Sequence, residues 1–302
     1  MAGSINGFLR KFDIEKLLLQ KYIIGIVFFM INFLILKQTH NFMKNTFRLP
    51  LLTLLIMVIS SISGYAQEKE YYELKTYTIK NDDQEKMVDN YLEHAYLPAL
   101  KRMGIKPVGV FKVRPDKFKV SDKIYVLIPF QSLAEFDKLE SMLAVDKTHL
   151  SSGAEYINAT HDKKPYERIS SVLMKAFHDM PKMKPSKVEG KRTDRVYELR
   201  SYEGPTEAMY NRKVNMFNEG GEVELFESLG FNAVFYADVI SGDKMPNLMY
   251  MTTFTNMEKR DALWKDFGSS DKWKEISVID KYQNTVSHAD IYLLYPTEYS
   301  DY

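Results

Sequence analysis

The feature that most constrains this fold is a pattern that occurs twice in the chain. Tyr72–Tyr77 (YELKTY) recurs as Tyr197–Tyr202 (YELRSY), 125 residues later. Two further pairs of segments keep nearly the same spacing: Met103–Ile105 with Leu229–Phe231, and Ile124–Val126 with Met249–Met251. A duplicate of such a long period predicts two copies of one subdomain rather than a solenoid of short repeats.

Each copy predicts the element order β-α-β-β-α-β, because alternating apolar segments flank stretches of helical periodicity. Gly104 and Gly230 follow the first helix of each copy, where glycine typically ends a helix. The expected strands are 71–80, 107–113, 123–130 and 167–177 in the first copy, and 195–203, 232–240, 247–254 and 285–295 in the second. The expected helices are 82–103, 132–144, 206–229 and 256–267.

This order is typical of a split βαβ unit, a four-stranded antiparallel sheet with both helices on one face. The bare faces of two such sheets can cover each other. We therefore predict an α+β fold of two tandem ferredoxin-like repeats that form a pseudo-dimeric α/β barrel, which can hold one small ligand. The expected repeats are 67–178 and 195–302, joined by a Lys- and Pro-rich surface linker at 179–194.

An export signal is predicted ahead of the repeats. Lys44 and Arg48 precede the apolar run 49–62, and small residues follow up to Ala66. A basic start, a short apolar core and small residues before cleavage form a secretory signal, so we expect a periplasmic chain cleaved after Ala66. The earlier apolar run, Tyr22–Leu36, is either a short anchor or an upstream region ahead of a true start at Met43.

Composition excludes several classes of function. The net charge is +1, which gives no general attraction to nucleic acid. The chain has no cysteine, which excludes disulfides, thiolate metal sites and a cysteine nucleophile. No stable membrane span is expected in the mature chain, and either a monomer or a homo-oligomer is compatible with two in-chain copies.

The mature region resembles the NIPSNAP family. The two openings carry the resemblance, together with AYLPALKRMGIKPVGVFKV, FNEGGEVELFESLGF, MPNLMYMTTFTNMEKRDALW and Asp271–Trp273. The resemblance spans about residues 67–296 and implies an exported two-domain bacterial member of the dimeric α/β barrel group. That wider group includes small oxygenases, haem enzymes and ligand-binding stress proteins, so the fold implies no single chemistry. The first copy departs from the second, because it has Leu139 and Leu150 where the second has Trp264 and Trp273.

Strand alternation divides the repeated opening into two faces. We expect the face of Leu74 and Leu199 to meet the helices. The opposite face would then line the lumen, with Glu–Lys and Glu–Arg pairs that offset the cost of buried charge. The predicted ligand-binding residues are Glu73, Lys75, Tyr77, Glu198, Arg200, Tyr202 and Tyr250. The alternative is that these residues are only structural ion pairs.

Helix breakers occupy matching places, Pro98 in the first copy and Gly220–Gly221 in the second, and indicate a bend or an entrance to the lumen. His94 and His288 are the candidates for the haem ligation seen in distant relatives. No histidine pair has metal-ligand spacing, so no metal site and no cofactor is predicted.

Two functions fit these observations. The first is an exported barrel that binds a small, partly apolar molecule between its two sheets. The alternative is a cofactor-independent oxygenase or isomerase in which lumenal phenols, Tyr77 or Tyr202, and acids, Glu73 or Glu198, move protons. No catalytic residue is assigned, since the sequence contains no recognisable catalytic constellation.

Overall fold

The strands predicted from the repeat form in both halves of the chain. The computed structural model describes residues 68–115 and 122–302, so the predicted export segment at 1–66 lies outside the described residues. The elements of the first repeat are β1 (Tyr71–Thr78), α3 (Asp82–Tyr91), the π-helix η2 (Leu92–Tyr96), α4 (Leu97–Arg102), β2 (Gly109–Val113), β3 (Lys123–Phe130), α5 (Leu133–Leu143), α6 (Lys147–Ser152), α7 (Ala154–Ile157), the 3-10 helix η3 (His161–Lys163) and β4 (Arg168–Ala176).

The second repeat follows the same order. Its elements are β5 (Val196–Glu203), α8 (Glu207–Phe217), α9 (Glu222–Ser228), β6 (Asn232–Ser241), β7 (Asn247–Phe254), α10 (Met257–Ser269), α11 (Asp271–Ser277), the 3-10 helix η4 (Asp280–Tyr282) and β8 (His288–Pro296). None of the helices in the described ranges has the length and apolar content that a membrane crossing requires.

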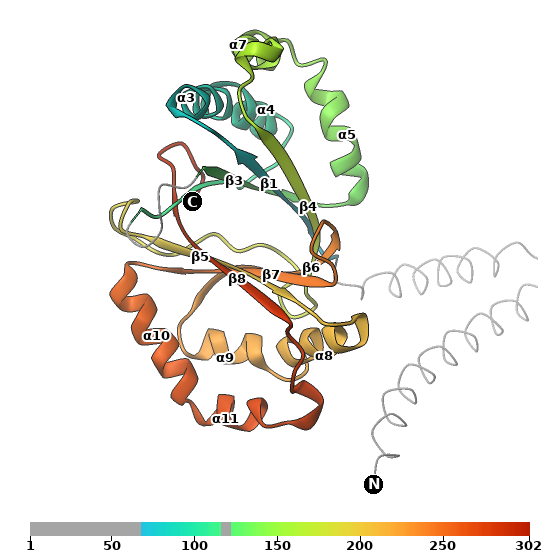
Figure 1. The fold of residues 1–302 in the computed structure, drawn as a ribbon, viewed down its shortest axis with the longest axis vertical. Helices are drawn as coiled ribbons and strands as arrows, with labels where there is room; N and C mark the ends of the chain where they lie inside the picture. The colour runs from blue at the N-terminus through green and yellow to red at the C-terminus, as the bar shows by residue number, and fades with distance from the viewer. Residues whose placement is uncertain (1–67, 116–121) are drawn as a thin grey trace, which may run out of the picture. The chain divides into compact units, whose positions relative to one another are not determined.

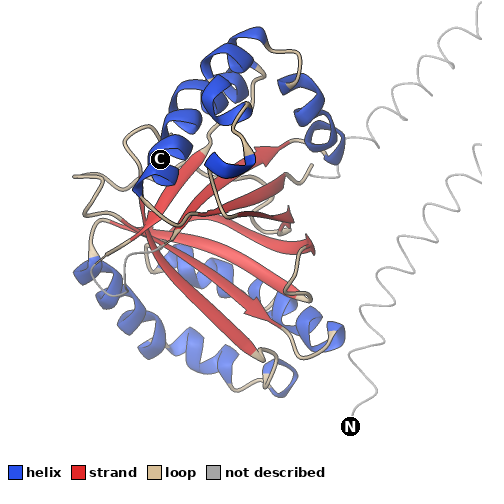
Figure 2. Ribbon diagram, turned by 45° about the horizontal axis from the view of Figure 1, so that its top comes forward, coloured by secondary structure: helices blue, strands red, loops and turns tan. Residues whose placement is uncertain are grey.

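The described strands close into one antiparallel barrel in the order β1-β3-β2-β8-β5-β7-β6-β4. Two seams join the repeats: β2 pairs with β8, and β4 pairs with β6 across a register shift. The helices lie outside, those of the first repeat on one side of the strands and those of the second on the opposite side (Figures 1 and 2). Closure removes every sheet edge, which is the usual reason a barrel is stable without a partner strand. The predicted pseudo-dimeric α/β barrel is confirmed.

Matching caps start the helices of the two repeats. Asn81 and Thr206 cap α3 and α8, and Ser132 and Asn256 cap α5 and α10, each through a side-chain oxygen that accepts from a backbone N–H of the first turn. The predicted C-terminal glycines are in the left-handed region, with φ of +83° at Gly104 and +84° at Gly230.

The two predicted helix breakers act differently. Pro98 has no N–H to donate to the carbonyl of His94, and the chain widens just before it into the π-helix, where the N–H of Leu97 bonds to the carbonyl of Leu92. Pro98 then lies in the first turn of α4, where a missing donor is tolerated. The first helical stretch therefore continues through the breaker.

In the second repeat the breaker does interrupt the helix, between α8 and α9. Gly221 has φ of +82°, and a Cβ on Gly220 would lie 2.5 Å from the carbonyl oxygen of Met216. Only glycine fits both positions without strain. The break is a bend within the helix layer.

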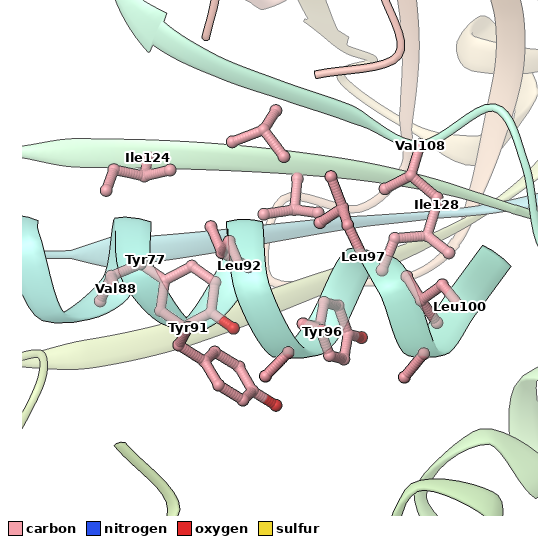
Figure 3. Packing of buried hydrophobic residues seen from close by; sticks show 14 of the residues in the cluster. Tyr77, Val88, Tyr91, Leu92, Tyr96, Leu97, Leu100, Val108, Ile124 and Ile128 are labelled. Carbon is pink, nitrogen blue, oxygen red and sulfur yellow. The ribbon is translucent and has the colours of Figure 1, made fainter. Parts of the chain in front are cut away.

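Each helix layer packs on its own half of the barrel. In the first repeat α3, η2 and α4 bury their apolar side against β1, β2 and β3, and Figure 3 shows Val88, Leu92 and Leu97 of this cluster with Ile124 and Ile128 from the sheet. The second repeat has a corresponding cluster rich in aromatic rings.

A third cluster takes side chains from all eight strands, and so fills the barrel interior. It contains Tyr72, Leu74, Phe111, Tyr125, Leu127, Met174, Ala176, Tyr197, Leu199, Phe235, Ala237, Met249, Met251 and Leu294, among others. The prediction that Leu74 and Leu199 meet the helices is therefore wrong. The helix layers supply ionic partners that the apolar interior cluster lacks, Glu140 of α5 for Lys75 and Arg260 of α10 for Glu198.

One end of the barrel is closed by the segment between the repeats. The backbone N–H of Met183 donates to the Glu70 carboxylate at 2.7 Å, and that of Lys184 donates to the carbonyl of Val234 at 3.0 Å. Met183 and Val188 pack on the interior cluster beside the C-terminal Tyr302. The segment predicted as a surface linker thus seals the end at which β1 and β5 begin.

Candidate functional site

The predicted ligand-binding residues lie between the strands and the helices, not in the lumen. Tyr77 belongs to the first-repeat cluster and Tyr250 to the second-repeat cluster, with Tyr202 packed against the latter. Both charged pairs predicted from the sequence form: the Lys75 ammonium is 3.9 Å from Glu73, and Arg200 is 2.6 Å from Glu198. The pairing is confirmed and the lumenal placement is wrong.

Glu198 is the centre of a buried network in the second repeat. Its side chain is 0% exposed and accepts from Arg200 Nε at 2.7 Å, from Arg260 Nε at 2.7 Å and from Trp264 Nε1 at 2.9 Å. The Arg200 guanidinium also stacks on the Trp264 ring, 3.7 Å from its centroid. The network ties β5 to α10, since Arg260 and Trp264 both belong to that helix.

The charge state of Glu198 follows from these contacts. Burial by itself raises the pKa of this carboxyl, but the hydrogen bonds from Arg260 and Trp264 and the charges of Arg200 and Arg260 outweigh it, so the pKa lies below its usual value. A carboxylate held ionised with both oxygens occupied is not a base for a substrate proton.

The phenols next to this network are also occupied. Arg200 donates to the Tyr202 hydroxyl at 2.7 Å, and the hydroxyls of Tyr202 and Tyr250 are 3.0 Å apart. Burial raises the pKa of Tyr250 well above its usual value. These side chains support the helix layer, and none of them lines the cavity described next.

A cavity of about 120 Å³ opens in the lumen at the end opposite the linker. Its apolar wall is Leu74, Leu199, Val172, Val239 and Met249, with the rings of Tyr125 and Tyr292. Its polar groups come from strand ends and one turn: Thr76, Lys123, Ser170, Ser201, Gly242, Asp243, Lys244 and Asn247. This volume is smaller than the roughly 300 Å³ at which drug-sized pockets begin, so the cavity fits a small molecule only.

Asn247 gives this cavity an unused hydrogen-bonding atom. The residue is 2% exposed, its amide nitrogen donates to the Ser201 hydroxyl at 2.8 Å, and among the described residues no group donates to its Oδ1. A buried polar atom without a partner costs about 1–3 kcal/mol. The Asn247 Oδ1 is therefore the atom of this wall that a hydrogen-bond donor would stabilise most.

Charged side chains surround the mouth of the cavity. Lys244 donates to Asp290 at 2.5 Å, and His288 lies 3.2 Å from the same carboxylate. The ligand atoms of Glu203, His288 and Asp290 lie within 4.8 Å of one another. A metal cation there would have to displace the Lys244 ammonium, so we interpret the cluster as an ion-pair rim.

The sequence does not predict the lumenal polar residues, because the face expected to meet the helices is the one that lines the lumen. Thr76 and Ser201 share that face with Leu74 and Leu199. Asn247 begins its strand and carried no signal of its own. The usable signal was the position of small polar residues at the ends of otherwise apolar strand faces.

Comparisons with known proteins agree with this fold. Residues 197–301 match the model of the NIPSNAP family. None of the curated proteins matches the chain. A NIPSNAP family protein from Agrobacterium tumefaciens str. C58 is 17% identical, with a TM-score of 0.32 over 35% of this chain and 96% of that chain.

Longer matches come from two solved structures described as putative monooxygenases. The one from Lactobacillus acidophilus NCFM is 14% identical with a TM-score of 0.50, and the one from Fusobacterium nucleatum is 9% identical with a TM-score of 0.51. Each covers 76% of this chain and 94% of that chain. At these identities the likeness shows the fold alone.

Proposed function

We propose that the barrel binds one small, partly apolar molecule in the lumenal cavity. The chain belongs to the NIPSNAP family through its second repeat. The observation that carries the proposal is the Oδ1 atom of Asn247, buried beside the cavity and without a partner. The ligand class follows from the lining: an apolar body against Leu74, Leu199 and Met249, and a hydroxyl, amine or amide donor toward Asn247.

Access supports a binding role for this end of the barrel. The opposite end is covered by the segment around Met183 and by Tyr302, whereas the cavity lies where β1 and β5 end. The alternative of acid–base turnover by Tyr77 or Tyr202 with Glu73 or Glu198 has no support from the geometry, because all four side chains lie on the helix side of their strands and none lines the cavity.

The test is a titration of the mature chain with 1-butanol, which has an apolar chain and one hydroxyl donor, followed by methyl NMR. We expect saturable shifts at the methyls of Leu74, Leu199 and Met249. Asn247→Leu keeps the heavy-atom shape of the side chain and removes the acceptor, so butanol should bind about 10-fold more weakly.

The matched control is Thr252→Val on the same strand. Thr252 is also buried with an unpartnered hydroxyl, but it lies two residues from Tyr250 on the helix side of β7, so butanol binding should persist. An affinity for butanol that is unchanged in Asn247→Leu, or lost in Thr252→Val, contradicts the lumenal assignment. Native mass spectrometry of the chain from its own compartment would then identify a natural occupant.

We also propose that the chain is exported, since Lys44, Arg48, the apolar run 49–62 and the small residues up to Ala66 form the pattern of a cleaved signal. Intact-mass analysis of the chain from a periplasmic extract should give a product that begins at Gln67. A product that retains residues 44–66 contradicts the proposal.

A further inference from the structure

The helix layers of the two repeats differ at three equivalent positions. The caps Ser132 and Asn256 start α5 and α10, and the caps Asp146 and Ser270 start α6 and α11, both 124 residues apart. With this offset, Glu140, Leu143 and His149 of the first repeat correspond to Trp264, Phe267 and Trp273 of the second. The predicted counterparts of the tryptophans, Leu139 and Leu150, are each one residue away from these positions.

In the second repeat the three large rings fill the layer. Trp264 and Phe267 have centroids 5.4 Å apart, Phe267 and Trp273 are 4.5 Å apart, and Phe226 and Phe231 pack on them. Edge and stacked contacts at these distances are typical of a closed aromatic core.

In the first repeat the smaller side chains leave a cavity of about 480 Å³. Glu140, Leu143 and His149 all line it, and none of its lining residues belongs to a strand. The remaining wall is aromatic and aliphatic: Tyr91, Ala144, Leu150, Tyr156, Ile157, Ala159, Pro165 and Tyr166. This volume falls in the range of small-molecule sites, and the cavity is separate from the one in the lumen.

The aromatic side of the cavity is a packed group of tyrosines. Tyr91 and Tyr156 are stacked face to face at 3.8 Å with an interplanar angle of 4°, and the Tyr166 ring lies 5.9 Å from Tyr156 at an angle of 40°. Tyr77 on β1 packs edge-on against Tyr156 and Tyr166, and Figure 3 shows Tyr77 and Tyr91 within the first-repeat cluster. Rings packed in this way suit edge-to-face and offset-stacked contacts with an aromatic ligand.

The Tyr91–His149 pair supplies the cavity with an acceptor. The Leu143 carbonyl can only accept, so its 3.2 Å contact with His149 places a proton on Nδ1. With that proton on Nδ1, Nε2 accepts from the Tyr91 hydroxyl at 3.0 Å, which leaves the Tyr91 oxygen as an acceptor. Glu140, 79% exposed at the rim, offers a carboxylate. A ligand with a donor group therefore suits the Tyr91 side of the cavity, and the Glu140 carboxylate disfavours an anion.

We propose that this cavity binds a planar, uncharged aromatic molecule that carries a hydroxyl or amino donor. The donor bonds to the Tyr91 oxygen, and the Tyr91–His149 hydrogen bond polarises that acceptor. The ring lies against the wall of Tyr91, Tyr156 and Tyr166.

The experiment uses three naphthalenes observed by saturation-transfer NMR with the mature chain. 2-Naphthol, which has the donor, should bind with a dissociation constant below about 1 mM. 2-Methoxynaphthalene lacks the donor and should bind about 10-fold more weakly, the value of one hydrogen bond. 2-Naphthoate should bind more weakly still because of Glu140.

Two variants locate the binding. Ala144→Trp places a large ring in the cavity from its rim and should abolish 2-naphthol binding. Ala154→Trp adds the same ring at an exposed position of α7 that does not line the cavity, and should leave binding unchanged. Asn247→Leu should also leave it unchanged, which separates this site from the lumen.

Several results overturn the proposal: no binding of 2-naphthol, binding that survives Ala144→Trp, binding lost in Ala154→Trp or in Asn247→Leu, or equal affinity for 2-naphthol and 2-methoxynaphthalene. Thermal unfolding of each variant confirms that a loss of binding is local.

Discussion

Replacing Glu198 by glutamine tests whether the charged strand face is structural. The carboxylate is fully buried and accepts from Arg200, Arg260 and Trp264. In Glu198→Gln the amide NH₂ faces guanidinium donors, and Arg200 and Arg260 lose the carboxylate between them, with the exposed Asp261 left beside Arg260. Removing one partner of a buried ion pair costs about 3–5 kcal/mol, which in a domain of this size lowers the Tm by roughly 10 °C.

The first repeat contains the matched control. Glu73 is the equivalent residue and is 4% exposed, but within the described part of the chain it accepts a hydrogen bond from Ser171 alone, at 2.7 Å, with the Lys75 ammonium 3.9 Å away. A glutamine at this position keeps the Ser171 hydrogen bond and leaves one cation that also contacts Glu140. We expect Glu73→Gln to cost about 1 kcal/mol.

The assay is urea unfolding of the chain followed by circular dichroism, with the m-value checked for two-state behaviour. Equal losses in the two variants, or a loss below about 1 kcal/mol in Glu198→Gln, would refute the assignment of Glu198 as the anchor of α10. If Glu198→Gln were less stable than the wild type only in the presence of a ligand, Glu198 would instead be assigned to the binding site.

Two further predictions concern pH and glycine. The pKa of Glu198 is lower in the folded chain than in the unfolded chain. The ionised carboxylate therefore contributes fully to stability above the unfolded pKa of about 4.3, and this contribution is lost as the pH falls through the folded pKa. The difference in unfolding free energy between the wild type and Glu198→Gln should narrow below about pH 4. A gap that stays constant down to pH 3 contradicts this. In Gly268→Ala the new Cβ in α10 meets nothing within 4 Å, so the variant should be more stable to urea by about 0.5–1 kcal/mol. In Gly220→Ala the new Cβ meets the Met216 carbonyl, so the variant should be less stable by about 1–3 kcal/mol in the same assay.

The sequence predicts the barrel because duplication, strand alternation and helix ends are local signals that agree with one another. The glycines at 104 and 230 end helices where expected, and the expected strands form within a few residues. The choice of face is different, because closure buries both faces of every strand. Tyr72 and Leu74 face the lumen while Glu73 and Lys75 face the helices, and all four are largely buried. Alternation alone does not distinguish two buried faces.

Tyr250 shows that a difference of one residue in the alignment of the two repeats decides which face of the sheet a side chain occupies. An offset of 125 residues aligns Tyr125 with Tyr250, but the strand pairs align Tyr125 with Met249, because Thr76 pairs with Tyr125 and Ser201 pairs with Met249. A shift of one residue moves a side chain to the other face. Tyr250 therefore lies among the second-repeat helices, and its neighbour Met249 lines the lumen.

This register also determines how many ligands the lumen can take. Equivalent residues of the two repeats meet at the same end of the barrel, since Leu74 and Leu199, and Thr76 and Ser201, all line the cavity. A barrel made of two identical chains would present every polar group there twice. In this chain the first strand pair places Lys123 opposite Thr78, and the second places Asn247 opposite Glu203, so the Asn247 side chain has no copy in the first repeat. Its Oδ1 is the acceptor of the cavity lining that lacks a partner among the described residues, and the butanol titration should therefore saturate at one molecule per chain. A stoichiometry of two would mean that the amide does not select the ligand.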